Sequence, residues 1–282
     1  MSVSASSAST MPTSVESKQD DGPGTVRFTN VQDLLNVIDC TARDSLTVTN
    51  VSLNRFTEIN YTREEQGRKF RFRDYGSNSQ ILIITIPIDL HEQLHKLLYD
   101  EHIRQVDKRC WKNIGSATRS AQVHSGRSSK EGDSTGGPKP ERAAKGAWPT
   151  LVIGAGVSQT LGQLRINMRR WFSMSSHEVK IIILAKFDGT KILLEKWEEE
   201  MVVNPGATTT RRSLQHQLPV LRQSITITQN ATTNPISYNV TRGALVPSFR
   251  LLFLRDPGPG EGNLVFSVQA LEEYAENIWI EL

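Results

Sequence analysis

The sequence predicts an α/β domain with a mixed central sheet flanked by helices, and three observations indicate this class. The run ILIITIPI at Ile81 to Ile88 is apolar and rich in β-branched residues, which is typical of a buried strand. From Asp89 to about Val106, apolar residues recur on one helical face, which predicts an amphipathic helix directly after that strand. From Leu151 onward the pattern reads strand, helix, strand and strand, an order that favours an α/β core.

We expect one folded domain over residues 25–282, preceded by a disordered tail over residues 1–24. The tail is rich in Ser, Thr, Pro and Gly and lacks the apolar segment of a secretory signal. Residues 116–147 contain almost no large apolar side chain and are dominated by Ser, Gly, Lys, Arg and Pro. This composition predicts a flexible loop within the domain.

In the N-terminal half, a helix and two further strands are expected before the buried strand. Thr29 and Asn30 can cap a helix that starts at Val31, where apolar residues recur at helical spacing. The runs at 56–61 and 69–73 are rich in β-forming residues and predict strands.

In the C-terminal half, strands and helices alternate first, and a β-rich part follows. The expected strands are 151–153, 179–187, 191–197, 224–228, 249–254 and 264–268, and the expected helices are 160–172 and 270–277. The last three strands form an added β-rich C-terminal part of the α/β domain.

Composition favours an intracellular protein of the nucleus or cytoplasm. The chain has 33 basic and 30 acidic residues, so no strong overall field attracts it to nucleic acid or to a membrane. Its longest apolar runs are far shorter than the roughly 20 residues needed to span a bilayer, so we expect no membrane partner. The two cysteines, Cys40 and Cys110, belong to no metal-ligand pattern and are expected to be buried thiols.

The motif HEQLH at His91 to His95 is the spelling with which zinc hydrolases place two imidazoles around zinc. The helix carries Asp89 and Lys96 close to the motif, and the extended pattern that would add a third histidine is missing. We therefore expect a surface helix whose polar face carries His91, His95 and His102, with a zinc hydrolase as an alternative.

A glycine-rich segment, VIGAGVSQ at 152–159, resembles the opening of a dinucleotide-binding fold. Gly154 and Gly156 fit the motif, but Gln159 replaces the third glycine and Asp188 comes later than the usual acidic residue. A glycine-rich strand end is the simpler interpretation.

The segment from Lys130 to Phe172, followed by VKIIILAKF and KILLEKWE, carries a resemblance through the order and spacing of its pieces. It resembles a family of fungal PD-(D/E)XK nuclease-like proteins, in which K-E-A-D-x-x-x-x-P precedes P-T-L-V-V-E-V-G-x-S and L-R-x-D-A-x-x-W. The match covers 130–198, about a quarter of the chain. The resemblance implies a restriction-endonuclease-like fold whose active site lies where the segment with Asp133 meets the strand that ends at Gly154.

The resemblance also implies that two of three acidic positions are lost. Asp133 stands at the first acidic position, Gly154 at that of a strand glutamate, and Asn167 at that of a helix aspartate. Mg²⁺ requires hard oxygen ligands to hold the ion against a phosphate, and these substitutions remove carboxylates. We therefore expect Asp133 to be a catalytic remnant in a degenerate homologue without cleavage activity, metal site or cofactor.

An active metal-dependent nuclease is the first alternative. It would need Mg²⁺ and a relocated acid, and the candidates that the sequence offers are Glu131, Glu141 and Glu178.

We expect the degenerate homologue to bind nucleic acid or a protein partner without cleaving it. Lys130 together with Arg165, Arg169 and Arg170 on the expected helix could hold phosphates. The simpler interpretation of these arginines is a solvated helix face.

Overall fold

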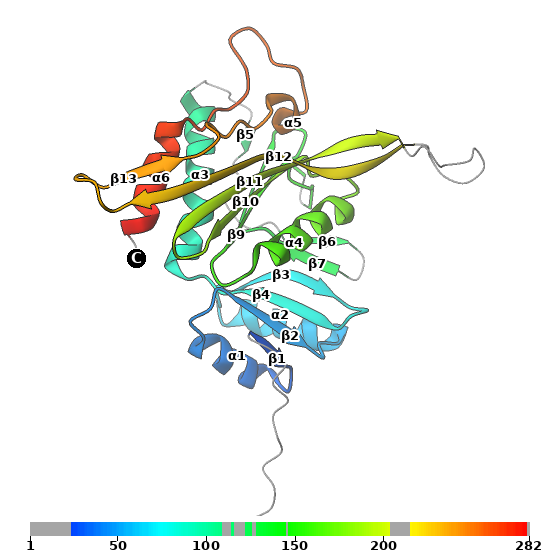
Figure 1. Ribbon diagram of the computed structural model, residues 1–282. Helices are drawn as coiled ribbons and strands as arrows, with labels where there is room; N and C mark the ends of the chain where they lie inside the picture. Colours follow the sequence, from blue (N-terminus) through cyan, green and yellow to red (C-terminus); the bar gives the residue numbers. More distant parts are fainter. Residues whose placement is uncertain are drawn as a thin grey trace, which may run out of the picture.

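The computed structural model describes residues 24–108, 114–115, 122–125, 128–144, 146–203 and 215–280. Within these residues, the strands form a six-stranded sheet in the order β1-β2-β4-β3-β7-β6 and a seven-stranded sheet in the order β13-β12-β11-β10-β9-β8-β5. Helix α4 lies between the two sheets (Figure 1). The α/β class is confirmed, with two mixed sheets where the sequence pattern indicates one central sheet.

The first sheet and its helices come mainly from the N-terminal part of the chain. Its elements are β1 (Thr25–Arg27), α1 (Val31–Cys40), β2 (Ser45–Thr49), α2 (Leu53–Glu65), β3 (Arg71–Gly76) and β4 (Ile81–Thr85). The Asn30 side chain accepts a hydrogen bond from the backbone N–H of Asp33 and caps α1 as expected. Cys40, at the end of this helix, is exposed rather than buried.

The strand expected at 56–61 is wrong, because these residues belong to α2. Ser52 caps the helix through a hydrogen bond from the backbone N–H of Arg55. Phe56 and Ile59, three residues apart, are both buried on one side of the helix, so helical spacing fits the core better than strand alternation does.

The second sheet contains the segment that carries the family resemblance. Its elements, with the helices around them, are α3 (Asp89–Lys108), β5 (Ile114–Gly115), β8 (Ser134–Pro138), β9 (Leu151–Gly156), α4 (Leu161–Met174), β10 (Ile181–Phe187), β11 (Lys191–Val203), β12 (Gln215–Asn230), β13 (Ser237–Val240), α5 (Phe249–Phe253) and α6 (Val268–Ile280). Strand β8 is antiparallel to β9, and β10 is parallel to β9.

Part of the loop expected at 116–147 is regular structure. Strands β6 (Gln122–Ser125) and β7 (Ser128–Glu131) extend the first sheet, and β8 joins the second. Lys130, Glu131 and Asp133 are buried, so this polar segment passes through the interior between the two sheets. Residues 1–23 of the tail expected at 1–24, and Cys110, lie outside the described residues.

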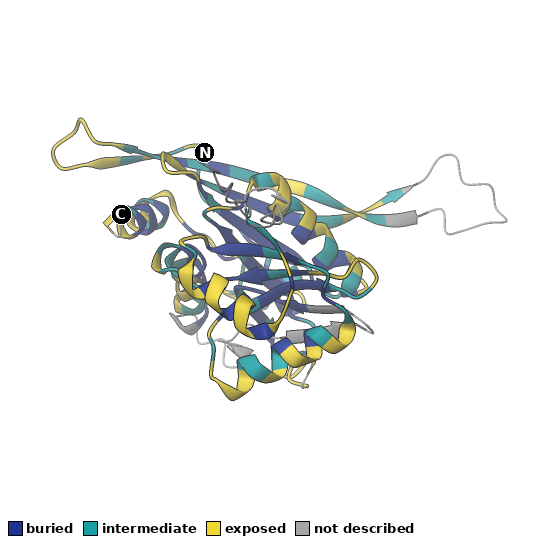
Figure 2. Cartoon of the chain, turned by 90° about the horizontal axis from the view of Figure 1, so that it is seen from below, coloured by how far each residue is buried: buried dark blue, intermediate teal, exposed yellow. Residues whose placement is uncertain are grey.

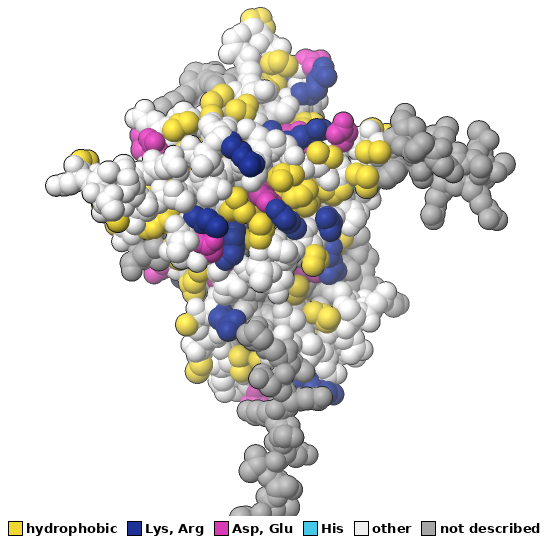
Figure 3. Space-filling model, in the orientation of Figure 1, with side chains coloured by type: hydrophobic (Ala, Val, Ile, Leu, Met, Phe, Trp, Pro, Cys, Tyr) yellow, Lys and Arg dark blue, Asp and Glu magenta, His cyan; other side chains and the backbone are white. Residues whose placement is uncertain are grey.

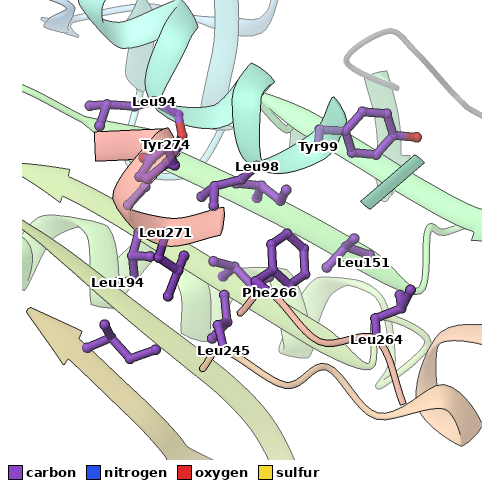
Figure 4. Packing of buried hydrophobic residues seen from close by; sticks show 14 of the residues in the cluster. Leu94, Leu98, Tyr99, Leu151, Leu194, Leu245, Leu264, Phe266, Leu271 and Tyr274 are labelled. Atoms are coloured by element: carbon purple, nitrogen blue, oxygen red, sulfur yellow. Dashed lines mark hydrogen bonds between the residues drawn. The ribbon is translucent and has the colours of Figure 1, made fainter. Parts of the chain in front are cut away.

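Helices cover both faces of the second sheet. On one face, α3 and α6 pack against β9, β10 and β11 (Figure 4), and the Tyr274 hydroxyl donates a hydrogen bond to the Leu94 carbonyl at 3.0 Å. On the other face, α4 buries Leu164, Met168 and Trp171 against the sheet. Thr160 and Gln163 form a capping box at the start of α4, which fixes where the helix begins.

The β-rich C-terminal part is only partly confirmed. Strand β12 extends the expected strand at 224–228 into a long hairpin with β11, and Figure 2 shows that this hairpin projects from the buried centre of the molecule. The strand expected at 249–254 is helix α5, because Phe249, Leu252 and Phe253 bury one helical face. In place of the strand expected at 264–268, the structure has an isolated bridge between Phe266 and Leu245.

Candidate functional site

The structure brings Asp133 and Gly154 together. Asp133 directly precedes β8, and Ser134, the first residue of β8, pairs with Ile153 of β9. Because the two strands are antiparallel, this register places Asp133 opposite Gly154. The Asp133 Oδ2 atom accepts a hydrogen bond from the backbone N–H of Ala155 at 2.9 Å. Two of the three positions expected from the resemblance are therefore neighbours.

Cationic side chains surround the Asp133 carboxylate. Arg73 Nη2 lies 3.4 Å from Oδ2, while Arg71 Nη2 lies 3.7 Å and His91 Nε2 lies 3.3 Å from Oδ1. Burial raises the pKa of Asp133, but the positive charges of Arg73 and His91 outweigh it and hold the pKa well below its ordinary value. The carboxylate is thus an anion that the protein itself already neutralises.

Beside Gly154 lies a small cavity of about 20 Å³. Its wall combines Arg73, Glu131, Asp133 and Asn167 with apolar residues of α4, β9 and β10. A Cβ atom at Gly154 would meet Leu184 Cδ2 at 3.5 Å, an ordinary van der Waals contact. A volume of this size is enough for a water molecule, for which about 10–15 Å³ is needed.

Asn167, which the resemblance aligns with a third acidic position, faces Lys130. Lys130 Nζ donates a hydrogen bond to Asn167 Oδ1 at 3.3 Å, lies 3.8 Å from Asp74 Oδ1 and lies 5.4 Å from the centre of the Trp171 ring. Burial lowers the pKa of Lys130 to about 8, although Asp74 opposes this shift. Lys130 is completely buried, so its ammonium group does not reach the protein surface.

The three arginines of α4 differ in their surroundings. Arg165 donates a hydrogen bond from Nε to Glu195 Oε2 at 3.0 Å, and its Nη2 atom pairs with the other carboxylate oxygen. Arg170 pairs with Asp74. Arg169 is exposed and makes no ion pair within the described part of the chain. Only a fraction of the basic helix face expected from the sequence is therefore free to bind an anion.

Of the acids that could be relocated, Glu131 comes nearest to the site. It lines the same cavity as Asp133, but its two oxygens accept hydrogen bonds from Arg63 Nη1 at 3.0 and 3.2 Å, and Oε2 also accepts one from the Phe72 backbone N–H. Burial raises the pKa of Glu131. Glu178 pairs with Arg142 and Glu141 is exposed, so neither is placed at the cavity.

The histidine helix α3 is not the surface helix that the sequence predicts. His91, His95 and His102 are all buried, because α3 packs on the second sheet and its histidine face meets the interior between the sheets. His91 bridges two carboxylates: Nδ1 bonds to Asp44 Oδ2 at 2.9 Å, and Nε2 faces Asp133. Burial lowers the pKa of His91, but the two carboxylates outweigh it and raise the pKa above its ordinary value.

Asp44 also explains the glycine-rich segment. Its carboxylate accepts hydrogen bonds from the backbone N–H groups of Val157 at 2.7 Å and Ser158 at 2.8 Å. These N–H groups lie between β9 and α4, where a dinucleotide fold would hold a phosphate. An internal carboxylate from the loop before β2 occupies that position instead.

No protein-family model matches this chain, and no curated protein matches it either. Among the described residues, no helix combines the length and the apolar character required to cross a bilayer.

Proposed function

We propose that this protein is a degenerate relative of the PD-(D/E)XK nucleases that does not cleave nucleic acid and instead binds a protein partner. The observation that carries the proposal is the environment of Asp133. Its carboxylate is surrounded by Arg73, Arg71 and His91 and lies opposite Gly154, which has no side chain. A divalent metal would have to compete with three cationic groups for a single carboxylate.

The order of elements around this site supports the nuclease-like interpretation. The chain passes from α3 through β8 to the antiparallel β9, crosses the sheet as α4 and returns as β10 parallel to β9. The resemblance implies an active site at the junction of the segment that carries Asp133 with the end of β9, which is where the two residues meet.

The charges on α4 favour a protein over nucleic acid as the partner. Glu195 and Asp74 neutralise Arg165 and Arg170, and Lys130 is buried. A surface that binds phosphates non-specifically needs several free cations, each of which releases counterions from the nucleic acid.

Exposed apolar side chains lie near the same helix. Ile166 of α4, Met201 of β11 and Leu221 of β12 are exposed. Leu221 pairs with Trp197, which packs against α4. Met201 lies on the same face of β11 as Trp197, because side chains alternate along a strand. Figure 3 shows apolar side chains gathered around this hairpin, interspersed with basic ones.

A nuclease assay tests the absence of cleavage. Single- and double-stranded DNA and RNA are incubated with the purified protein and Mg²⁺ or Mn²⁺, in parallel with Asp133→Ala. We expect no product above the level of the variant. Divalent-dependent cleavage that Asp133→Ala abolishes would overturn the proposal, and cleavage that Glu131→Gln abolishes would favour the alternative of a relocated acid.

A pair of matched variants tests the choice of partner. Ile166→Asp places a charge on the proposed surface, while Ile280→Asp does the same at an exposed isoleucine at the end of α6. We expect a protein captured by the wild type to be lost with Ile166→Asp and kept with Ile280→Asp. Tight, salt-dependent binding of DNA or RNA that Arg169→Ala weakens would favour nucleic acid instead.

A further inference from the structure

The two sheets belong to two parts of the molecule with separate hydrophobic cores. The first part, the lower one in Figure 1, contains β1 to β4, α1, α2, β6 and β7, and its core is built from residues 26–86. The second part contains α3, the second sheet and the remaining helices, and its apolar clusters are built from residue 90 onward. Among the described residues, no cluster combines apolar side chains of both parts. Burial of apolar surface therefore stabilises each part, while other contacts join the two.

The contacts that join the two parts are polar. Asp44 of the first part accepts hydrogen bonds from the backbone of the loop between β9 and α4. Next to it, the Ser45 hydroxyl accepts a hydrogen bond from Gln159 Nε2 at 2.6 Å. Arg73 donates to Gln159 Oε1 and, from Nη2 at 3.1 Å, to the Ala155 carbonyl. Three polar side chains of the first part thus bind β9 and the loop that follows it.

Ion pairs continue the contact along α3 and α4. Arg71 of β3 pairs with Glu92 of α3, and Asp74 of β3 pairs with Arg170 of α4. Lys130 of β7 donates a hydrogen bond to a side chain of α4 at 3.3 Å. We call this contact the polar seam, and its members on the first part are Asp44, Ser45, Arg71, Arg73, Asp74 and Lys130.

A polar seam opens at a lower cost in free energy than an apolar core. When the seam opens, water replaces the lost hydrogen bonds, so the net contribution of each bond is small. The charged groups also regain the hydration that burial removes from them. Exposure of an apolar core has no such compensation. Polar contacts between two parts of one chain therefore allow the parts to move relative to each other.

We propose that the protein opens along the polar seam while both cores stay folded, and that opening uncovers Asp133. The Asp133 side chain is 5% exposed when the seam is closed, and two of its cationic neighbours, Arg71 and Arg73, belong to the first part. His91 belongs to the second part and remains beside the carboxylate. Because Gly154 supplies no second acid, opening does not create a metal site.

Two short connections among the described residues act as hinges. Residues 86–88 link β4 to α3, and residues 132–133 link β7 to β8. Residues at the ends of elements can absorb the changes of φ and ψ that accompany such a motion. The opening is independent of the proposed function, because it involves neither cleavage nor the exposed apolar side chains of α4 and the hairpin.

Thr85 is a suitable position for a probe of the seam. It lies on β4 directly opposite Ser45 of β2, so both side chains point to the seam. Its hydroxyl accepts a hydrogen bond from Arg73 Nε at 2.9 Å. Thr85 is 0% exposed, as are Val48 in the first core and Ala185 in the second. Cysteines at these three positions therefore start from equal burial and differ in what covers them.

Cysteine labelling tests the opening. Thr85→Cys, Val48→Cys and Ala185→Cys are made singly in a chain with Cys40→Ser and Cys110→Ser. Reaction with a thiol reagent is followed at increasing urea concentration, and each rate is divided by the rate in the unfolded chain. We expect Thr85→Cys to react at least about 10-fold faster than both core cysteines without urea, because opening of the seam costs less than global unfolding. Its rate should also depend less on urea, since this dependence scales with the surface exposed.

Two arginine variants identify the seam as the place of opening. Arg170→Ala removes the pair with Asp74 and should raise the labelling rate of Thr85→Cys at least about 3-fold. Arg169→Ala is the matched control at an exposed position of the same helix and should change the rate by about 2-fold at most. An unchanged rate in Arg170→Ala would overturn the proposal.

Equal rates and equal urea dependence at all three cysteines would also overturn the proposal, because they describe a single cooperative unit. Circular dichroism shows whether each variant is folded. If Thr85→Cys does not fold, Ser45→Cys at the neighbouring position takes its place. None of these outcomes alters the nuclease assay, so the two proposals fail separately.

Discussion

Asp44 and Ser158 form a hydrogen bond of 2.8 Å that links the loop before β2 to the loop between β9 and α4. The same carboxylate binds His91 of α3 and the backbone N–H of Val157. It therefore connects the first sheet, the second sheet and α3 in the interior. The Ser158 hydroxyl is a fourth donor to Asp44, so this carboxylate belongs to a buried network in which each member depends on the others.

Replacing Asp44 should destabilise the protein severely. In Asp44→Ala, His91 Nδ1 and the N–H groups of Val157 and Ser158 lose their acceptor, and the cost of breaking a buried pair is about 3–5 kcal/mol. Urea unfolding measures the effect as a lower midpoint. The control is Asp39→Ala, because Asp39 pairs with Arg68 at the surface and is half exposed. The free energy of unfolding of that variant should fall by at most about 1 kcal/mol. Equal losses of stability in the two variants would contradict the proposed role of Asp44 in a buried network.

His102 should make the protein less stable in mild acid. Burial lowers its pKa to about 4, and its Nδ1 atom has no hydrogen-bond partner among the described residues. Since the unfolded chain has an ordinary histidine pKa of about 6.5, it binds the proton first as the pH falls. The stability contributed by neutral His102 is complete above pH 6.5 and declines towards pH 4, by up to about 1.4 kcal/mol per pH unit.

The measurement compares wild type with His102→Gln. Carboxylates titrate in the same range, so the difference between the two unfolding curves isolates the histidine. The wild type should lose more stability than the variant between pH 6.5 and 4. Parallel losses would mean that His102 is solvated and that burial does not depress its pKa.

Local patterns predicted the second sheet well, because its elements are marked by strong periodicity. The apolar strands around 151–153 and 179–187 and the capped helix at 160–172 each have a pattern set by neighbours close in sequence. The pairing of Asp133 with Gly154 followed from the resemblance alone. The residues that neutralise Asp133 were not predicted, since Arg71, Arg73 and His91 approach it from segments distant in sequence.

The sequence carried a signal for the cationic residues around Asp133, but this signal was ambiguous. Arg71 and Arg73 alternate with aromatic residues in KFRFRDYG, which is also the pattern of a strand with one solvated face. Similarly, charged neighbours of HEQLH indicated a surface helix, although the histidines lie on the face opposite to solvent. Whether a polar strand face meets water or another polar surface depends on tertiary packing, which periodicity does not report.

Two arginines one helical turn apart should respond differently to truncation. Arg165→Ala removes the partner of Glu195, whose carboxylate is 1% exposed and keeps only the Trp197 Nε1 donor among the interactions described here. We expect a loss of about 1–3 kcal/mol, the cost of a buried group left partly unsatisfied. Arg169→Ala should change stability by about 0.5 kcal/mol or less, as at other exposed positions. If thermal unfolding gives the same midpoint for both, Arg165 is free to bind an anion and the argument against nucleic acid weakens.

Two glycines of β9 offer the last test, because alanine should have opposite effects at them. At Gly154 the added Cβ meets Leu184 at 3.5 Å beside the cavity, so Gly154→Ala should stabilise the protein by about 0.4–1 kcal/mol through the unfolded chain. At Gly156 the Cβ would approach Leu164 Cδ1 at 3.0 Å, and Gly156→Ala should destabilise by about 1–3 kcal/mol, because α4 has to move away from the strand. Unfolding midpoints in urea compare the two directly. A destabilised Gly154→Ala would mean that the cavity beside β9 does not accept an added methyl group.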